Sequence, residues 1–318
     1  MNAIRAPAEA GASFGSEPTP EVPAFAGKQV LQLACVVLLL TACASPPPPA
    51  PRGQQPTIVS LNPCTDAILA EVADPAQILA MSHYSHDPRA SSMDPAAARR
   101  FRAIGGTAEE VAALAPDLVV GSSFIDPATR AALGDLGLRV QTFASPATVE
   151  ESVAQVRALA ALAGHPDRGE ALVRRIEAAV AAPPGPPVEA ALWQGGGIVP
   201  GKGTLVSDLM QRAGLSGYAE AHGMAQGDYL SLEQIAADPP ALLLVAGEER
   251  GQRHPLLARI PGLKVASFEP RLFYCGGPSI PKAMERLRAI ASPREGGGLS
   301  RQALRRNERG PRLRGGAV

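Results

Sequence analysis

Two cysteines and two histidines are the side chains in this sequence whose types and positions could support metal binding or thiol chemistry. Cys64 and Cys275 each follow a short apolar run and lie at or near the start of a predicted helix. A thiolate at a helix N-terminus is acidified and can bind soft metals, so both are candidate ligand contacts. Buried thiols, which we favour over ligation, and a disulfide are the alternatives. His83 and His86 have no third ligand at metal-site spacing, so we expect solvated loop histidines and no resident metal.

Signatures of catalysis are incomplete. The segment from Gly196 to Thr204 resembles a P-loop, but Gly203 stands where the magnesium-binding Ser or Thr belongs. No Gly-x-Ser-x-Gly motif occurs either. We therefore expect a protein that is not an enzyme and that carries no cofactor. An exported lipoprotein enzyme or scaffold that uses Cys64, Cys275 and the loop histidines is the alternative.

The elements that position these residues alternate between strand and helix, which predicts an α/β fold with parallel sheets. The expected strands are residues 57–61, 77–80, 118–120, 139–143, 189–193, 241–245 and 272–274, and the expected helices include 63–72, 145–163, 165–182 and 204–213. The longest helical stretch separates two sets of strands. The pattern predicts two α/β lobes joined by a long linking helical segment.

An internal repeat relates the two lobes. The segment from Thr107 to Val120 matches the segment from Ser231 to Leu244, and both begin with a capping box, run as a short helix to a proline and continue as a strand. Glu109 and Glu233 occupy the same position in the two copies, where each favours the helix dipole.

The N-terminal segment predicts export. Val30 to Ala42 is an apolar run preceded by Lys28, too short for a stable membrane span but of the right length for a signal peptide. It ends in Leu-Thr-Ala-Cys at Cys43, which resembles a lipobox, so we expect Cys43 to be acylated and to anchor the protein to the membrane. The prolines from Pro46 to Pro49 then predict an extended spacer.

Charge is balanced over the whole chain, with 30 basic and 30 acidic residues, but the two signs are not evenly distributed. The segment from Pro293 to the end carries seven Arg and two Glu. A basic tail of this kind predicts disorder, and the body lacks the clustered positive charge that phosphate binding needs. We therefore expect no nucleic-acid partner.

Taken together, several of these motifs resemble the vitamin B12 and ferric-siderophore binding proteins of ABC importers. They are the Ser60 to Asp66 segment, the Ser82 to Asp87 turn, the Gly105-Gly106 pair, the linking helices and the two capped helices, and the similarity covers roughly residues 57–291. The resemblance implies two Rossmann-like lobes with a metal chelate bound between them and little hinge motion. It also implies that Glu109 and Glu233 dock onto arginines of the two permease subunits.

Ligand contacts are expected beyond the carboxyl ends of the strands. The candidates are Asn62, Cys64, Thr65, Tyr84, Ser122, Phe124, Trp193, Tyr229 and Cys275. Tyr84 corresponds to a ligand-contacting tyrosine of the B12 binders, and Trp193 could equally be a core anchor. Aromatic side chains beside glycines suit a flat macrocycle or chelate better than a sugar.

These observations predict a periplasmic, membrane-anchored lipoprotein, monomeric, that delivers a cobalamin-like, ferric-siderophore or heme ligand to an ABC permease. The expected division is a signal peptide 1–43, a spacer 44–56, an N-terminal lobe 57–145, linking helices 146–183, a C-terminal lobe 184–292 and a basic tail 293–318.

Overall fold

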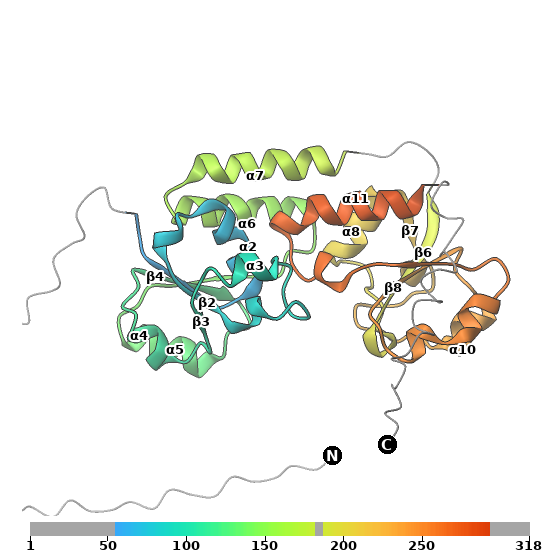
Figure 1. Cartoon of the computed structure of the whole chain (residues 1–318), viewed down its shortest axis with the longest axis horizontal. Coiled ribbons are helices and arrows are strands. Elements are labelled where there is room, and N and C mark those ends of the chain that lie inside the picture. Colours follow the sequence, from blue (N-terminus) through green and yellow to red (C-terminus); the bar gives the residue numbers. More distant parts are fainter. Residues whose placement is uncertain (1–54, 182–186, 293–318) are drawn as a thin grey trace, which may run out of the picture. The chain divides into compact units, whose positions relative to one another are not determined.

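The computed structural model describes residues 55–181 and 187–292 (Figure 1). The predicted signal peptide with Cys43, most of the spacer and the basic tail lie outside the described residues. Within the described part, no helix has the length and apolar character needed to cross a membrane.

The N-terminal lobe is built on a five-stranded parallel sheet with the order β3-β2-β1-β4-β5. Its strands are β1 Ile58–Ser60, β2 Ile78–Ser82, β3 Ala103–Ile104, β4 Leu118–Ser122 and β5 Val140–Phe143. Its helices are α2 Pro63–Val72, α3 Pro95–Ala98, α4 Ala108–Ala112 and α5 Pro127–Asp135, with 3-10 helices η1 Pro75–Gln77 and η2 His83–His86.

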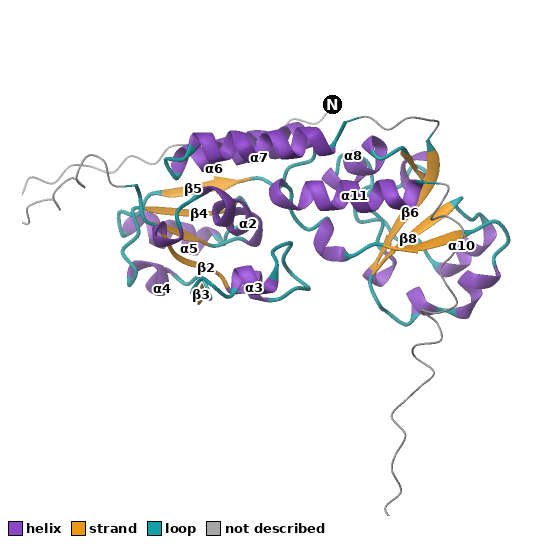
Figure 2. Cartoon of the chain, turned by 45° about the horizontal axis from the view of Figure 1, so that its top comes forward, coloured by secondary structure: helices purple, strands orange, loops and turns teal. Residues whose placement is uncertain are grey.

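Alternation along the strands assigns side chains to the two faces of this sheet. Ile58 and Val120 belong to the core beneath helix α2, whereas Val59 and Val119 pack with Leu133 of α5 on the opposite face. Both faces are covered, as all-parallel sheets require. Figure 2 shows the sheet between these helical layers.

The C-terminal lobe has a four-stranded parallel sheet with the order β7-β6-β8-β9. Its strands are β6 Val188–Gln194, β7 Leu215–Gly217, β8 Leu242–Ala246 and β9 Lys264–Ser267. Its helices are α8 Leu205–Arg212, α9 Tyr218–Ala221, α10 Leu232–Ala237 and α11 Ile280–Ala291, with 3-10 helices η3 Gly195–Gly197, η4 Gly251–Arg253, η5 Pro255–Arg259, η6 Pro270–Leu272 and η7 Gly277–Ser279.

One expected strand of this lobe is wrong. Residues 272–274 end the 3-10 helix η6 and enter a loop, because Pro270 starts a tight turn immediately before them. The last strand is instead β9, which pairs in parallel with β8. None of its four residues is fully buried, and it begins with Lys264 and ends with Ser267, so a search for apolar runs does not find it.

The linking segment consists of two helices, α6 Val149–Leu162 and α7 Pro166–Ala179. They separate at Gly164, whose φ of +81° belongs to the left-handed region that glycine tolerates. Gly169 lets the two helices approach closely, because a Cβ there would lie 2.5 Å from the Cβ of Ala160. The two capping boxes of the repeat are also present, at Thr107 and Ser231.

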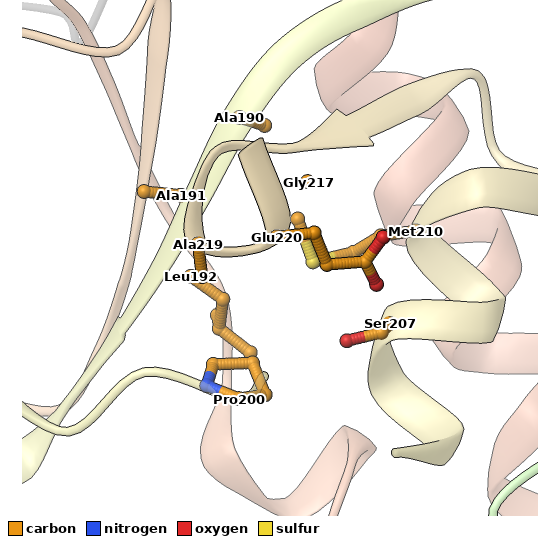
Figure 3. Close-up of a pocket in the computed structure, with 9 residues that line it drawn as sticks. All are labelled: Ala190, Ala191, Leu192, Pro200, Ser207, Met210, Gly217, Ala219 and Glu220. Atoms are coloured by element: carbon orange, nitrogen blue, oxygen red, sulfur yellow. The ribbon is translucent and has the colours of Figure 1, made fainter. Parts of the chain in front are cut away.

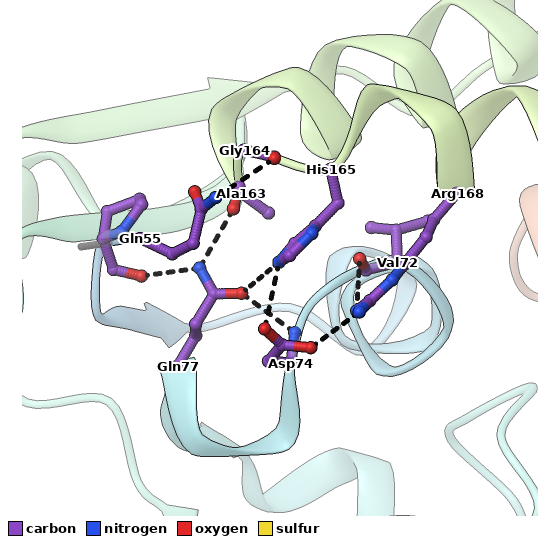
Figure 4. Close-up of polar contacts among 9 residues, drawn as sticks. Gln55, Val72, Asp74, Gln77, Ala163, Gly164, His165 and Arg168 are labelled. Atoms are coloured by element: carbon purple, nitrogen blue, oxygen red, sulfur yellow. Dashed lines mark hydrogen bonds and ion pairs between the residues drawn. The ribbon is translucent and has the colours of Figure 1, made fainter. Parts of the chain in front are cut away.

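A buried glutamine joins the N-terminal lobe to the linking helices (Figure 4). The amide nitrogen of Gln77 donates to the carbonyl oxygens of Pro56 and Ala163, both at 3.0 Å. Its oxygen accepts from the backbone N–H of Asp74 at 2.9 Å and lies 2.8 Å from Nε2 of His165. Since that oxygen can only accept, Nε2 of His165 carries the proton in this contact.

Candidate functional site

Each parallel sheet has one point at which its strand order reverses, and open α/β sheets bind ligands beyond the carboxyl ends of the strands there. In the N-terminal lobe this point lies between β1 and β4, where the chain leaves at Leu61 and Ser123. In the C-terminal lobe it lies between β6 and β8, where the chain leaves at Gly195 and Gly247.

The turn after β1 directs its polar groups inward to its own helix. The side-chain oxygen of Asn62 accepts from the backbone N–H groups of Cys64 and Thr65, at 2.9 and 3.4 Å, and so caps α2. The hydroxyl of Thr65 is buried, donates to the carbonyl of Asn62 and shares a 2.8 Å hydrogen bond with Ser60. Asn62 and Thr65 therefore shape the turn, and Thr65 offers no surface to a ligand.

The two cysteines of the described part form a disulfide. Cys64 at the start of α2 is bonded to Cys275 before η7, with their Cα atoms 5.1 Å apart. This pairing replaces our preferred expectation of two buried thiols, and it removes the thiolate ligands because a disulfide sulfur carries no ionisable proton. The sequence allowed the bridge but could not distinguish it from free thiols.

A buried carboxyl fixes the turn after β2. Asp66 is fully buried, and its Oδ2 accepts from the backbone N–H of Ser82 at 3.0 Å and from the hydroxyl of Ser85 at 2.6 Å. Burial raises the pKa of Asp66 to about 8, against the opposing effect of hydrogen bonds from serines that surround it. Its other oxygen has no hydrogen-bond partner among the described residues. Asp66 was absent from the candidate set, although its place in the first turn of α2 was visible in the sequence.

The turn held by Asp66 presents an aromatic ring to solvent. Tyr84 in η2 is 54% exposed and its ring lies 4.0 Å from that of His83, centroid to centroid. The ring nitrogens of His83 and His86 contact the backbone carbonyls of Ile104 and Ala98. Neither histidine belongs to a group of three potential metal ligands in the described residues.

The turn after β4 presents a second aromatic ring. Phe124 is 82% exposed, and the hydroxyl of Ser122 accepts from its backbone N–H at 3.1 Å. Ser122 therefore sets the direction in which the chain leaves the strand. The side chain of Phe124 projects from the same carboxyl end of the sheet that carries Tyr84.

In the C-terminal lobe the tryptophan is part of the core. Trp193 is only 4% exposed and packs with Leu243 and Tyr218. Its indole N–H donates to the carbonyl of Leu230 at 2.7 Å. Trp193 therefore has the core role that the sequence left open and presents no face for stacking on a ligand.

The glycines after Trp193 make room for a tyrosine. Tyr229 is 62% exposed and its ring crosses Gly197, where a Cβ would come within 2.4 Å of the ring. Glu249 closes the same turn, since its Oε2 accepts from the backbone N–H of Gly196 at 2.8 Å. Tyr229 is thus held at the point where the strand order of this sheet reverses.

Three of the exposed aromatic residues lie at or beside the carboxyl ends of strands. Tyr84, Phe124, Tyr229 and Tyr274 are the exposed aromatic residues of the described part. Tyr84 and Phe124 follow strands of one sheet, while Tyr229 lies beside the turn after β6 of the other. The exposed rings beside the strand ends are therefore candidate contacts for a ligand.

The repeated glutamates are exposed on their two helices. The pKa values of Glu109 and Glu233 are both lowered, in each case first by the backbone N–H of the residue itself and then by the hydroxyl of the capping residue. Neither forms an ion pair with another described residue. Glu109 also borders a shallow hollow between α4 and α5.

A small cavity lies in the C-terminal lobe (Figure 3). Its lining residues are Ala190, Ala191, Leu192, Pro200, Ser207, Met210, Gly217, Ala219 and Glu220. Its volume of about 10 Å³ is that of a site for one water molecule, far too small for a chelate.

Comparison with known proteins agrees with this arrangement. Residues 58–264 match the family model described as periplasmic binding protein. No curated protein sequence matches the chain.

The solved structures that share the fold include three proteins that bind heme or vitamin B12. A periplasmic heme-binding protein from Pseudomonas aeruginosa is 25% identical with a TM-score of 0.56, and the match covers 75% of this chain and 93% of that chain. The heme-binding protein HutB of Vibrio cholerae is 16% identical with a TM-score of 0.62, covering 74% and 99%. The vitamin B12 binding protein BtuF of Vibrio cholerae is 17% identical with a TM-score of 0.56, covering 74% and 96%. At those lower identities the last two support the fold alone.

Proposed function

Because the chain belongs to the periplasmic binding protein family, we propose that it captures a metal chelate of the corrinoid, heme or ferric-siderophore class and delivers it to the permease of an ABC importer. It is a binding protein and not an enzyme, as are the members and structural neighbours of the family. The observation that carries the ligand class is the set of exposed aromatic rings at the carboxyl ends of the strands of both sheets.

Aromatic faces suit this ligand class for a physical reason. A corrin, a porphyrin or a chelated iron offers a broad and weakly hydrated surface, and aromatic rings bury such a surface with little loss of side-chain entropy. A sugar or an amino acid would need converging polar side chains instead. The polar groups of Asn62 and Thr65 are already used by their own turn. We therefore place Tyr84, Phe124 and Tyr229 on the ligand, with Ser122 and Asn62 as the residues that orient the adjoining turns.

Titration of the purified protein with hemin, cyanocobalamin and ferrichrome tests the ligand class. All three absorb visible light, so an absorption difference spectrum and calorimetry report binding independently. We expect one of them to bind with a Kd in the micromolar range or below, at one molecule per chain. Lys202→Ala is a suitable control. Lys202 is exposed and lies in the segment that resembles a P-loop, and it is not one of the proposed ligand contacts. Failure of all three to bind at micromolar concentrations would contradict the proposal.

The permease is the proposed partner of Glu109 and Glu233. Both carboxylates are exposed, lie at matching positions of two short capped helices and are free of ion pairs within the described part. Charged pairs across such an interface chiefly determine orientation. The double variant Glu109→Ala, Glu233→Ala should fold and bind ligand normally, yet fail to support transport by the reconstituted permease. Unchanged transport would leave the two acids with their helix-capping role alone.

A lipid on Cys43 is the proposed membrane anchor. The residue follows an apolar segment and precedes a proline-rich spacer, which together match the processing site of a lipoprotein. Replacing it by serine should give protein that is unprocessed or that partitions into the aqueous phase of a detergent extraction. Normal processing and partition of Cys43→Ser into detergent would rule out this anchor.

A further inference from the structure

The disulfide connects two segments that are far apart in the sequence. Cys64 and Cys275 are separated by 211 residues, one at the start of α2 in the N-terminal lobe and the other beyond β9 of the C-terminal lobe. Cys275 is buried and Cys64 is half-buried. The bridge therefore attaches the segment Tyr274–Ser279 to the first turn of α2.

Contacts on both sides of the bridge fit this segment closely to the N-terminal lobe and to α6. The backbone N–H of Cys275 donates to the hydroxyl of Ser92 at 3.1 Å, and that of Gly277 donates to the hydroxyl of Ser152 at 2.8 Å. A Cβ on Gly277 would lie 2.8 Å from Ile68 of α2, and the φ of this glycine is +65°. Larger residues would therefore push the segment away from the helices.

The same segment carries an aromatic ring to the proposed binding face. Tyr274 is partly exposed, and its backbone oxygen lies 3.5 Å from Sγ of Cys64. Burial raises the pKa of its hydroxyl, with a further contribution from the negative charge of Asp87. Asp87 ends the 3-10 helix that presents Tyr84. The residue next to Tyr274, Cys275, is hydrogen-bonded through its backbone N–H to Ser92, in the loop that follows this 3-10 helix, so Tyr274 adjoins a residue attached to that loop.

We propose that the Cys64–Cys275 disulfide positions Tyr274 beside the Tyr84 turn, so that Tyr274 is a ligand-contacting residue and the disulfide is its covalent support. This inference rests on the proposed function for the ligand, but the positioning itself can be measured without one. The loop Phe273–Gly276 belongs to no strand or helix that would hold a side chain in place, whereas a covalent bond to the first turn of α2 restricts it.

Hydrogen exchange tests the positioning in the absence of ligand. In the double variant Cys64→Ser, Cys275→Ser we expect amide exchange at residues 273–279 to accelerate about tenfold or more, while the core strands β4 and β8 keep their protection. Treatment of the wild-type protein with dithiothreitol gives the same comparison if the variant does not fold. The reagent transfers two electrons and two protons to the bridge, leaving two cysteine thiols and a cyclic disulfide of the reagent. Unchanged exchange at residues 273–279 would overturn the proposal.

A double-mutant cycle tests the contact with ligand, using whichever of hemin, cyanocobalamin and ferrichrome binds the wild-type protein. We expect Tyr274→Ala and removal of the disulfide each to weaken binding about tenfold, and their combination to weaken it little more than either alone. A disulfide with a general structural role would give losses that multiply, and that result would overturn the proposal. Binding of none of the three probes contradicts the proposed function, while the exchange measurement still decides whether the disulfide holds the segment.

Discussion

The indole N–H of Trp193 donates a 2.7 Å hydrogen bond to the backbone carbonyl of Leu230. This contact ties the end of β6 to the segment that leads into α10, in the core between the sheet and that helix. Tyr229, the residue before Leu230, is exposed beside the glycine turn. The tryptophan therefore supports the position of Tyr229, a candidate ligand contact, from within the core.

Replacing Trp193 by phenylalanine should lower the free energy of unfolding by about 2–3 kcal/mol, because a cavity forms and the carbonyl of Leu230 loses its donor. Urea denaturation followed by far-ultraviolet circular dichroism measures the loss. Ligand affinity of the folded variant should change less than threefold. An affinity loss without a loss of stability would instead place the indole on the ligand.

Tyr84→Ala should weaken ligand binding by about 1–3 kcal/mol, since the variant removes an exposed ring at the carboxyl end of β2. Leu136→Ala is the matched control, because Leu136 is similarly exposed but lies between α5 and the amino end of β5, not at the carboxyl end of a strand. Isothermal titration calorimetry distinguishes the two. Equal losses for both variants would argue against a contact by Tyr84.

The buried carboxyl of Asp66 should make stability depend on pH. Its pKa is raised from 3.8 to about 8 on folding, so folding takes up a proton between these values. Protonated Asp66 therefore stabilises the folded state fully below the unfolded-state pKa of 3.8. This stabilisation is lost as the pH rises through the folded-state pKa of about 8, and the free energy of unfolding falls by up to about 1.4 kcal/mol per pH unit. Asp66→Asn removes the titrating group while keeping an acceptor for Ser82 and Ser85. Urea denaturation at pH 5 and pH 8 should show a decline for the wild-type protein that is smaller in the variant. Parallel pH profiles would show that Asp66 is ionised in the folded protein.

Gln77→Leu should destabilise the protein by about 2–4 kcal/mol, because it leaves the buried carbonyl of Ala163 without the amide donor of Gln77 and removes the 2.8 Å contact of the His165 ring, which keeps only its 3.4 Å contact with Asp74. Gln141→Leu is the control, since the side chain of Gln141 is exposed on β5 and a change there should stay within about 0.5 kcal/mol. Thermal and urea unfolding provide the comparison. A similar loss in both variants would mean that the network around Gln77 contributes little.

Local signals in the sequence determined the two-lobe α/β architecture. Short apolar strands, the capping boxes at Thr107 and Ser231, and the proline at the start of α2 depend on neighbouring residues only. These features predicted most helices and strands to within a few residues. The strands that the sequence did not predict were β3, β7 and β9, the first two being only two and three residues long. The segment after Pro270 was expected to be a strand, but there a tight turn overrides the apolar pattern.

Only the tertiary structure decided what the candidate side chains do. Whether Trp193 faces the core or the solvent depends on α10 and β8, which come 37 or more residues later. The pairing of Cys64 with Cys275 depends on how the start of α2 meets a loop that lies 211 residues later, and the sequence does not show how close these two segments come in the fold. Burial of Asp66 likewise needs the strand end at Ser82 and the turn at Ser85 to close over it. Spacing along a chain fixes local geometry, whereas exposure, pairing and pKa arise from contacts between segments that the sequence keeps apart.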